Sequence, residues 1–273
     1  DGLTNVVAVA AGRFHNLALR SDGTVAAWVV PQYLDRGVNS QPRVPIDLTN
    51  VVAVAAGGFN SLALRADGTV VWWDWGGSTL DVPGGLSNAV GVAMGESHCL
   101  ALRADGTVVA WGTYLSGKVS SGGTNLAMTV PAGLTNVVAV AAGQNYCLAL
   151  QADGTILAWG GSFWCGDSSP EENTPFGLTK VQALGGGSCH CLALIGDGPP
   201  VLQASVHHPT MTAEGFSVSV STQSGRVYRL EYKNSLADTD WTALPLVAGT
   251  GRERTLTDPT ATGAQRFYRV RRW

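Results

Sequence analysis

The amino-acid sequence predicts an all-β protein, in which an array of repeated strand units over residues 1–200 is followed by a small antiparallel β-sandwich over residues 201–273. Three observations support this prediction. Near copies of one segment recur through the first part of the chain, and most copies carry an Asp-Gly pair at the point where a hairpin would turn. The 35 glycines and the scarcity of long helix-forming runs favour many short strands joined by tight turns.

The repeat is clearest at residues 137–160, VVAVAAGQNYCLALQADGTILAWG, with further copies that begin at Val6, Val51, Ala89 and, in decayed form, Val181. The glycines that close the first strand of each copy are Gly12, Gly57, Gly95, Gly143 and Gly187, which gives spacings of 45, 38, 48 and 44 residues. Periods in this range are typical of stacked supersecondary units, as in a solenoid or a propeller.

Each unit contains a predicted hairpin. Asp153-Gly154 is a favoured pair for a two-residue type I′ turn, which would place Leu148 opposite Trp159. The same arithmetic pairs Leu17 with Trp28, Leu62 with Trp73 and Leu100 with Trp111. These tryptophans are therefore expected to be structural.

The regular repeat ends at Pro199-Pro200, because proline cannot donate a hydrogen bond to a central strand. Beyond it, FSVSVST and VYRLEYK alternate apolar and polar residues, and six or seven such short strands predict the sandwich. This part holds 9 Lys and Arg against 6 Asp and Glu, and its basic residues are expected to lie on a solvated strand face.

Composition and charge exclude some classes of function. Residues 1–200 hold 8 Lys and Arg against 14 Asp and Glu, which speaks against a nucleic-acid-binding surface. No apolar run is long enough for a membrane span and no signal peptide is visible; since the chain also lacks an initiator Met, we expect a processed or trimmed product.

The pattern AxGxxHxLAL followed by DGTVxAWG resembles the repeats of the regulator of chromosome condensation family, in which each repeat forms a propeller blade and seven blades commonly close a ring. The segments are also similar to those of the bacterial propeller-type β-lactamase inhibitor protein. The tail, with YRLEYKNSLADTDWTAL and QRFYRV, resembles sandwich modules of secreted bacterial surface proteins. Four full units and a partial fifth do not make seven blades, so a segment of a larger protein, a smaller ring and an arc completed by another chain all stay open.

No catalytic constellation, metal site or cofactor site is predicted. His15, His98 and His190 occupy one repeat position that also accepts Asn60 and Tyr146, which indicates a structural role. Cys99, Cys147 and Cys191 share a position with Asn16 and Ser61, as expected for free thiols at a small, partly buried site. Cys165 and Cys189 could form a disulfide if the protein is secreted.

A binding surface is the better candidate site. Two variable residues follow each repeat glycine (Arg13-Phe14, Gly58-Phe59, Glu96-Ser97, Gln144-Asn145 and Ser188-Cys189), and variable loops follow the tryptophans. The resemblance to the inhibitor implies that such positions contact a partner, with these candidates: Phe14, Phe59, Trp75, Tyr114, Phe163 and Trp164. Packing of these aromatic residues onto the blades is the equal alternative.

The expected function is therefore a non-enzymatic, secreted or cell-surface module of bacterial type that binds a protein or a glycan through its loop face. The alternative is a structural subunit of a head-to-tail extracellular assembly, a fibre or surface layer, formed through the open ends of the array and the basic C-terminal module. A homo-oligomer or filament would follow from the alternative.

Overall fold

A computed structural model describes residues 3–29, 41–112, 129–160, 178, 180–187, 190–196, 204, 206–261 and 265–273. Every regular element in these ranges is a strand, so the all-β prediction is confirmed. None of the described segments is a helix long and apolar enough to cross a membrane. The strands of the repeat units are β1 Val6–Ala11, β2 His15–Arg20, β3 Val25–Val29, β4 Val51–Ala56, β5 Ser61–Arg65, β6 Val70–Trp73, β7 Thr79–Leu80, β8 Ala89–Met94, β9 His98–Arg103, β10 Val108–Gly112, β11 Val137–Ala142, β12 Tyr146–Gln151, β13 Ile156–Gly160, β14 Val181–Gly186 and β15 Cys191–Ile195.

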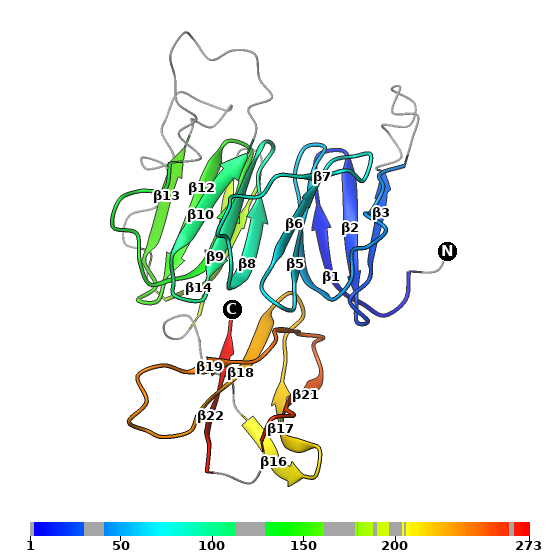
Figure 1. The fold of residues 1–273 in the computed structure, drawn as a ribbon. Helices are drawn as coiled ribbons and strands as arrows, with labels where there is room; N and C mark the ends of the chain where they lie inside the picture. Colours follow the sequence, from blue (N-terminus) through cyan, green and yellow to red (C-terminus); the bar gives the residue numbers. More distant parts are fainter. Residues whose placement is uncertain are drawn as a thin grey trace.

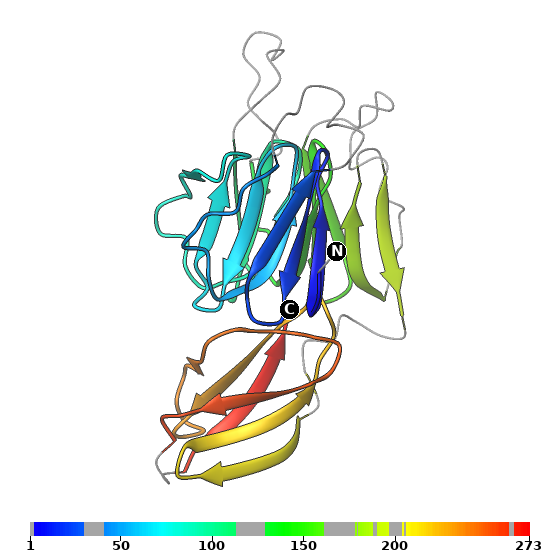
Figure 2. The same ribbon diagram turned by 90° about the vertical axis from the view of Figure 1, so that its right-hand side faces the viewer.

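Each repeat unit forms its own antiparallel sheet, and the sheets stack face to face in chain order (Figures 1 and 2). Unit 1 contains β1–β3, unit 2 β4–β7, unit 3 β8–β10, unit 4 β11–β13 and unit 5 β14–β15. The first strands of successive units adjoin one another, and each middle strand packs against the first strand of the next unit. This is the arrangement of propeller blades.

The repeat glycine is required by the close approach of these first strands. A Cβ atom built on Gly12 would lie 2.2 Å from the carbonyl oxygen of Gly57, and one on Gly57 would lie 2.2 Å from that of Gly95. Any larger residue would therefore push neighbouring units apart. The backbone N–H of Arg13 donates to the Gly57 carbonyl at 2.9 Å, so units 1 and 2 are also hydrogen-bonded here.

The linker ending in Leu-Thr-Asn positions the opposite end of each unit. Asn50, Asn88 and Asn136 adopt positive φ angles of 54–55°, a conformation that asparagine tolerates better than most residues. The carbonyl of Asn50 then accepts from the N–H of Ala66 in its own unit at 2.8 Å. The next residue, Val51, donates to Gly23 in the turn of unit 1 at 3.2 Å, so the linker joins each unit to the one before it.

The prediction of a two-residue turn is wrong, because the loop in the structure is one residue longer. Gly154 has φ of 88° and donates to the carbonyl of Gln151 at 2.9 Å, while the N–H of Gln151 donates to Thr155 at 2.8 Å. Asp153 does not adopt positive φ, and its carboxylate accepts from the N–H of Thr155 at 2.8 Å. The loop is thus a three-residue type I turn with a glycine bulge, favoured by Asp-Gly-Thr rather than by Asp-Gly alone.

This shift changes the partner of every predicted tryptophan. Instead of the leucines, the residues opposite Trp28, Trp73, Trp111 and Trp159 are Asn16, Ser61, Cys99 and Cys147. A one-residue slip moves side chains to the other face of a sheet, so the leucine pairings in the prediction are incorrect. In units 1 to 4 the residue before Leu-Ala-Leu therefore lies across from the tryptophan of its own hairpin, which favours a small side chain there.

The two ends of the array each leave an apolar face uncovered in the described chain. Leu192 and Leu194 of β15 are 65% and 61% exposed, although the equivalent Leu17 and Leu19 are fully buried against unit 2. On the other end, Val9 of β1 is 72% exposed. Among the described elements, no substantial contact joins unit 5 to unit 1, so the array is an open arc.

The C-terminal part folds as a sandwich of two antiparallel sheets. One contains β16 Val206–Thr212, β17 Gly215–Ser221 and β21 Glu253–Asp258; the other contains β18 Val227–Lys233, β19 Thr242–Ala243, β20 Val247–Ala248 and β22 Phe267–Arg272. The core between them includes Val218, Val220, Tyr228, Leu230 and Leu256. The predicted boundary near residue 200 falls among residues outside the described ranges.

The expectation that the basic residues of this part lie on a solvated strand face is wrong for β18. Arg229 and Glu231 are both buried, on the face of the strand opposite Tyr228 and Leu230. Glu231 pairs with Arg269 at 2.7 Å, and Arg229 lies over the ring of Trp273. Both partners, Arg269 and Trp273, belong to the sandwich itself, which lies against the repeat array (Figure 1).

Candidate functional site

Along the direction of its strands, the repeat array has two chemically different ends. At one end are the Asp-Gly turns and the linkers, and the C-terminal sandwich lies beneath them (Figures 1 and 2). At the other end are the connections from the first to the second strand of each unit, together with the segment that follows β6. We call the second end the loop face, and it carries Arg13, Phe14, Phe59, Glu96 and Trp75.

Three of the predicted partner-binding residues form one aromatic cluster on the loop face. Phe14 and Phe59 come from equivalent positions of units 1 and 2, and their rings stack with centroids 4.2 Å apart. Trp75 meets Phe59 edge to face with centroids 6.0 Å apart. Phe59, the ring that contacts the other two, is 42% exposed, so the aromatic cluster is open to solvent.

A charged seam runs beside the aromatic cluster. The guanidinium of Arg13 lies 5.1 Å from the centroid of the Phe14 ring and forms an ion pair with Glu96 of unit 3. The side-chain amide of Gln144, from unit 4, donates to the other oxygen of the Glu96 carboxylate. One seam therefore connects units 1, 3 and 4 through their side chains.

Gly58 explains how Arg13 reaches past unit 2. It holds the position equivalent to Arg13 and Glu96, and a Cβ atom there would lie 2.9 Å from the carbonyl oxygen of Glu96. Its N–H donates to that same carbonyl at 3.2 Å. The sequence named these residues as variable but missed their connection; opposite charges at equivalent positions, separated by a glycine, were the available signal.

The repeat histidines lie beneath this surface. His15 is fully buried; its Nε2 lies 2.8 Å from the hydroxyl of Ser61, and its ring meets Trp75 edge to face at 5.6 Å. Burial lowers the pKa of His15 and of His98 to about 4, so both are neutral near pH 7. Their position between units is that of packing residues, whereas His190 of the last unit is exposed.

The remaining predicted site residues fall on other parts of the chain. Tyr114, Phe163, Trp164, Cys165 and Cys189 lie outside the described residues, so the aromatic loops and the disulfide stay predictions. Cys99 and Cys147 are buried, whereas Cys191 is exposed. Within the described ranges, no three His, Cys, Asp or Glu side chains are grouped in a way that could hold a metal ion.

Comparison with known proteins agrees with this geometry. The family model for the regulator of chromosome condensation (RCC1) repeat matches residues 6–28 and 89–113, which fall in units 1 and 3. No curated protein matches the chain by sequence.

Two solved structures share the fold. The crystal structure of human WBSCR16 is 22% identical with a TM-score of 0.54, and the match covers 72% of this chain and 59% of that chain. A crystal structure of Kap60 bound to yeast RCC1 (Prp20) is 19% identical with a TM-score of 0.50, over 92% of this chain and 63% of that chain. The chain spans about three fifths of the length of these structures. Units 1 and 3 therefore match the RCC1 repeat model, and the described units are folded as successive blades of a β-propeller.

Proposed function

We propose that this chain is a non-enzymatic binding module that recognises a protein through the aromatic cluster of its loop face. The observation that carries the proposal is the cluster of Phe14, Phe59 and Trp75, which is partly exposed and bordered by the pair of Arg13 and Glu96. Aromatic and arginine side chains dominate the energetic centres of protein interfaces. The opposite end of the array is occupied by the C-terminal sandwich, which leaves the loop face as the accessible end.

The arrangement of the rings favours a protein over a glycan. A sugar ring binds best against the flat, open face of an aromatic side chain. Here one face of Phe14 lies against Phe59 and the ring also carries the guanidinium of Arg13, while Phe59 meets the edge of Trp75. The described surface thus presents mainly ring edges, which suit contact with an apolar side chain of a protein partner.

The wider setting is also part of the proposal. We place the module outside the cell, secreted or attached to a bacterial surface, on the basis of the resemblance of residues 201–273 to secreted sandwich modules. The absence of a catalytic role is proposed because the described titratable groups of the loop face are either buried and neutral, as His15 is, or paired with each other, as Arg13 and Glu96 are.

The test compares the proteins retained by immobilised wild type, Phe59→Ala and Trp241→Ala. Trp241 is an aromatic residue of the C-terminal sandwich that lies beside Lys233 and Arg269, away from the loop face. A partner of the aromatic cluster should be retained by wild type and by Trp241→Ala. Its affinity for Phe59→Ala should be about 10- to 100-fold lower. Retention by all three proteins, or binding of a glycan array that Phe59→Ala does not affect, would contradict the proposal. Circular dichroism checks that Phe59→Ala is folded.

A second candidate function is a structural subunit of a head-to-tail assembly, a homo-oligomer or filament. It is favoured by the uncovered apolar faces of β15 and β1, which correspond to the two faces that meet between neighbouring units. Its use of the basic C-terminal module is less well supported, because Arg226 and Arg271 already contact the array of the same chain. Light scattering distinguishes this candidate: particles that stay monomeric at every salt concentration would rule it out.

A further inference from the structure

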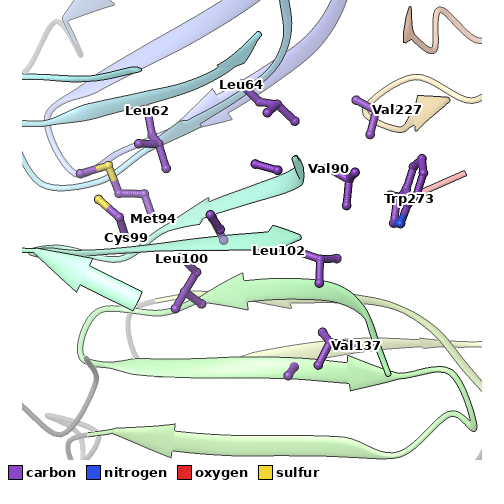
Figure 3. Packing of buried hydrophobic residues seen from close by; sticks show 14 of the residues in the cluster. Leu62, Leu64, Val90, Met94, Cys99, Leu100, Leu102, Val137, Val227 and Trp273 are labelled. Carbon is purple, nitrogen blue, oxygen red and sulfur yellow. The ribbon is translucent and has the colours of Figure 1, made fainter. Parts of the chain in front are cut away.

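One buried apolar cluster is shared between the repeat array and the C-terminal sandwich. Val227, Leu246 and Trp273 of the sandwich belong to the same cluster as Val52, Val90 and Val137 from the first strands of units 2, 3 and 4. Figure 3 shows Trp273 and Val227 facing Val90, close to Leu64 and Leu102 at the turn end of their strands. The sandwich thus completes the core of the array at its turn end.

Hydrogen bonds join the same two parts. The N–H of Leu246 donates to the carbonyl of Ala66 at 2.7 Å, and the guanidinium of Arg271 donates to the carbonyl of Ala104 at 3.2 Å. Ala66 and Ala104 are equivalent residues, each directly before the Asp-Gly pair of its unit. In addition, Arg226 donates to the carbonyl of Gln182 in unit 5 at 3.3 Å. The contacts of the sandwich therefore extend from unit 2 to unit 5.

Trp273 is held in place from several sides. It is 7% exposed, and its backbone exchanges two hydrogen bonds with Val227, at 3.0 and 3.2 Å. The guanidinium groups of Arg271 and Arg229 lie over its ring, with Cζ 4.7 and 5.7 Å from the centroid. A tryptophan fixed in this way acts as a rigid contact between the sandwich and the first strands of the array.

We propose that the C-terminal sandwich is a brace for the open array, binding the turn ends of units 2 to 5 and fixing the angles between them. In a closed ring every unit is held by a neighbour on each face, whereas units 1 and 5 here each have one uncovered face. The sandwich supplies the missing constraint from below, because its contacts cross the borders between units. Interfaces between domains of one chain usually permit relative motion unless they are large and apolar. The shared cluster makes this interface part of one core.

Hydrogen exchange of the full chain, read by mass spectrometry, tests the brace. Trp273→Ala removes the central contact. Trp241→Ala serves as the matched control because it removes a tryptophan of the same sandwich, whose ring lies beside Lys233 and Arg269 of that sandwich. We expect Trp273→Ala to raise exchange at the turn ends of units 2 and 3 by at least about 100-fold. The control should leave those segments at the wild-type rate. If Trp273→Ala changes exchange only within β18 and β22, the brace is refuted.

A second variant, on the array side of the interface, keeps the proposal testable if Trp273→Ala prevents the sandwich from folding. Val90→Ala alters only the array side of the cluster, in unit 3. If the two parts share one core, this variant should raise exchange in β18 and β22 as well as in its own unit. If the increase in exchange is confined to units 2, 3 and 4 and the sandwich exchanges at the wild-type rate, the proposal is overturned.

Discussion

Trp111 lies directly opposite Cys99 across the β9–β10 hairpin, and both side chains are buried in the cluster that unites the array. The same pair recurs as Trp159 with Cys147 and as Trp73 with Ser61. Each indole therefore sets the space that is available to the residue across from it.

This pairing predicts the size tolerance of the cysteine position. Cys99→Ala leaves a small cavity and should cost about 1 kcal/mol of the free energy of unfolding. Cys99→Phe must displace Trp111 and should cost about 1–3 kcal/mol or more. Urea unfolding of the two variants measures the difference; equal costs would show that Trp111 does not limit the site.

Burial also predicts the reactivity of the thiols. It raises the pKa of Cys99 and of Cys147 well above the ordinary range, whereas Cys191 is exposed. A thiol reagent followed by peptide mass spectrometry should modify Cys191 within the first minutes of reaction. Cys99 and Cys147 should react only at the rate at which the protein opens. Early modification of Cys147 would mean that unit 4 is open to solvent.

The close approach of the first strands predicts a sharp difference between two glycines. Gly57→Ala would place a methyl group 2.2 Å from the Gly95 carbonyl, and we expect a loss of about 1–3 kcal/mol or more in stability. Gly84→Ala, in the following linker, meets nothing within 4 Å and should change stability by less than about 0.5 kcal/mol. Thermal melts of the two variants provide the comparison, and similar melting temperatures would refute the tight contact.

The buried histidines predict that stability falls in acid. The pKa of His15 and of His98 is about 4 in the folded protein, against 6.5 when unfolded, so only the unfolded state binds protons between these values. Stability should be fully present above pH 6.5 and fall as pH drops towards 4, by on the order of 2–3 kcal/mol for each histidine.

Unit 2 offers the control for this pH dependence, because Asn60 occupies the same repeat position. His98→Asn should reduce the slope of unfolding free energy against pH between 4 and 6.5, whatever it does to stability at pH 7. The measurement is urea unfolding at several pH values. An unchanged slope would show that folding does not shift the pKa of His98.

The sequence by itself determined the unit and its number. The recurring glycine and the Asp-Gly pair are local signals: each specifies a backbone conformation or a close approach that few other residues allow. These signals predicted the strands of the five units and the all-β class. Phe14, Phe59 and Trp75 came forward as candidates because they stand at variable positions of the repeat, where the resemblance to the inhibitor implies contact with a partner.

Only the tertiary structure decided the rest. The hairpin register depends on whether Asp153 and Gly154 both adopt positive φ or Gly154 alone does so. The Asp-Gly sequence is compatible with either turn. The seam from Arg13 to Glu96 depends on the distance between units that are separated by Gly58. The burial of Trp273 depends on where the sandwich docks against the array. Alternation along a strand identifies two faces, but contacts between residues on different strands, such as Glu231 with Arg269 and Arg229 with Trp273, determine whether the polar face meets water or another part of the chain.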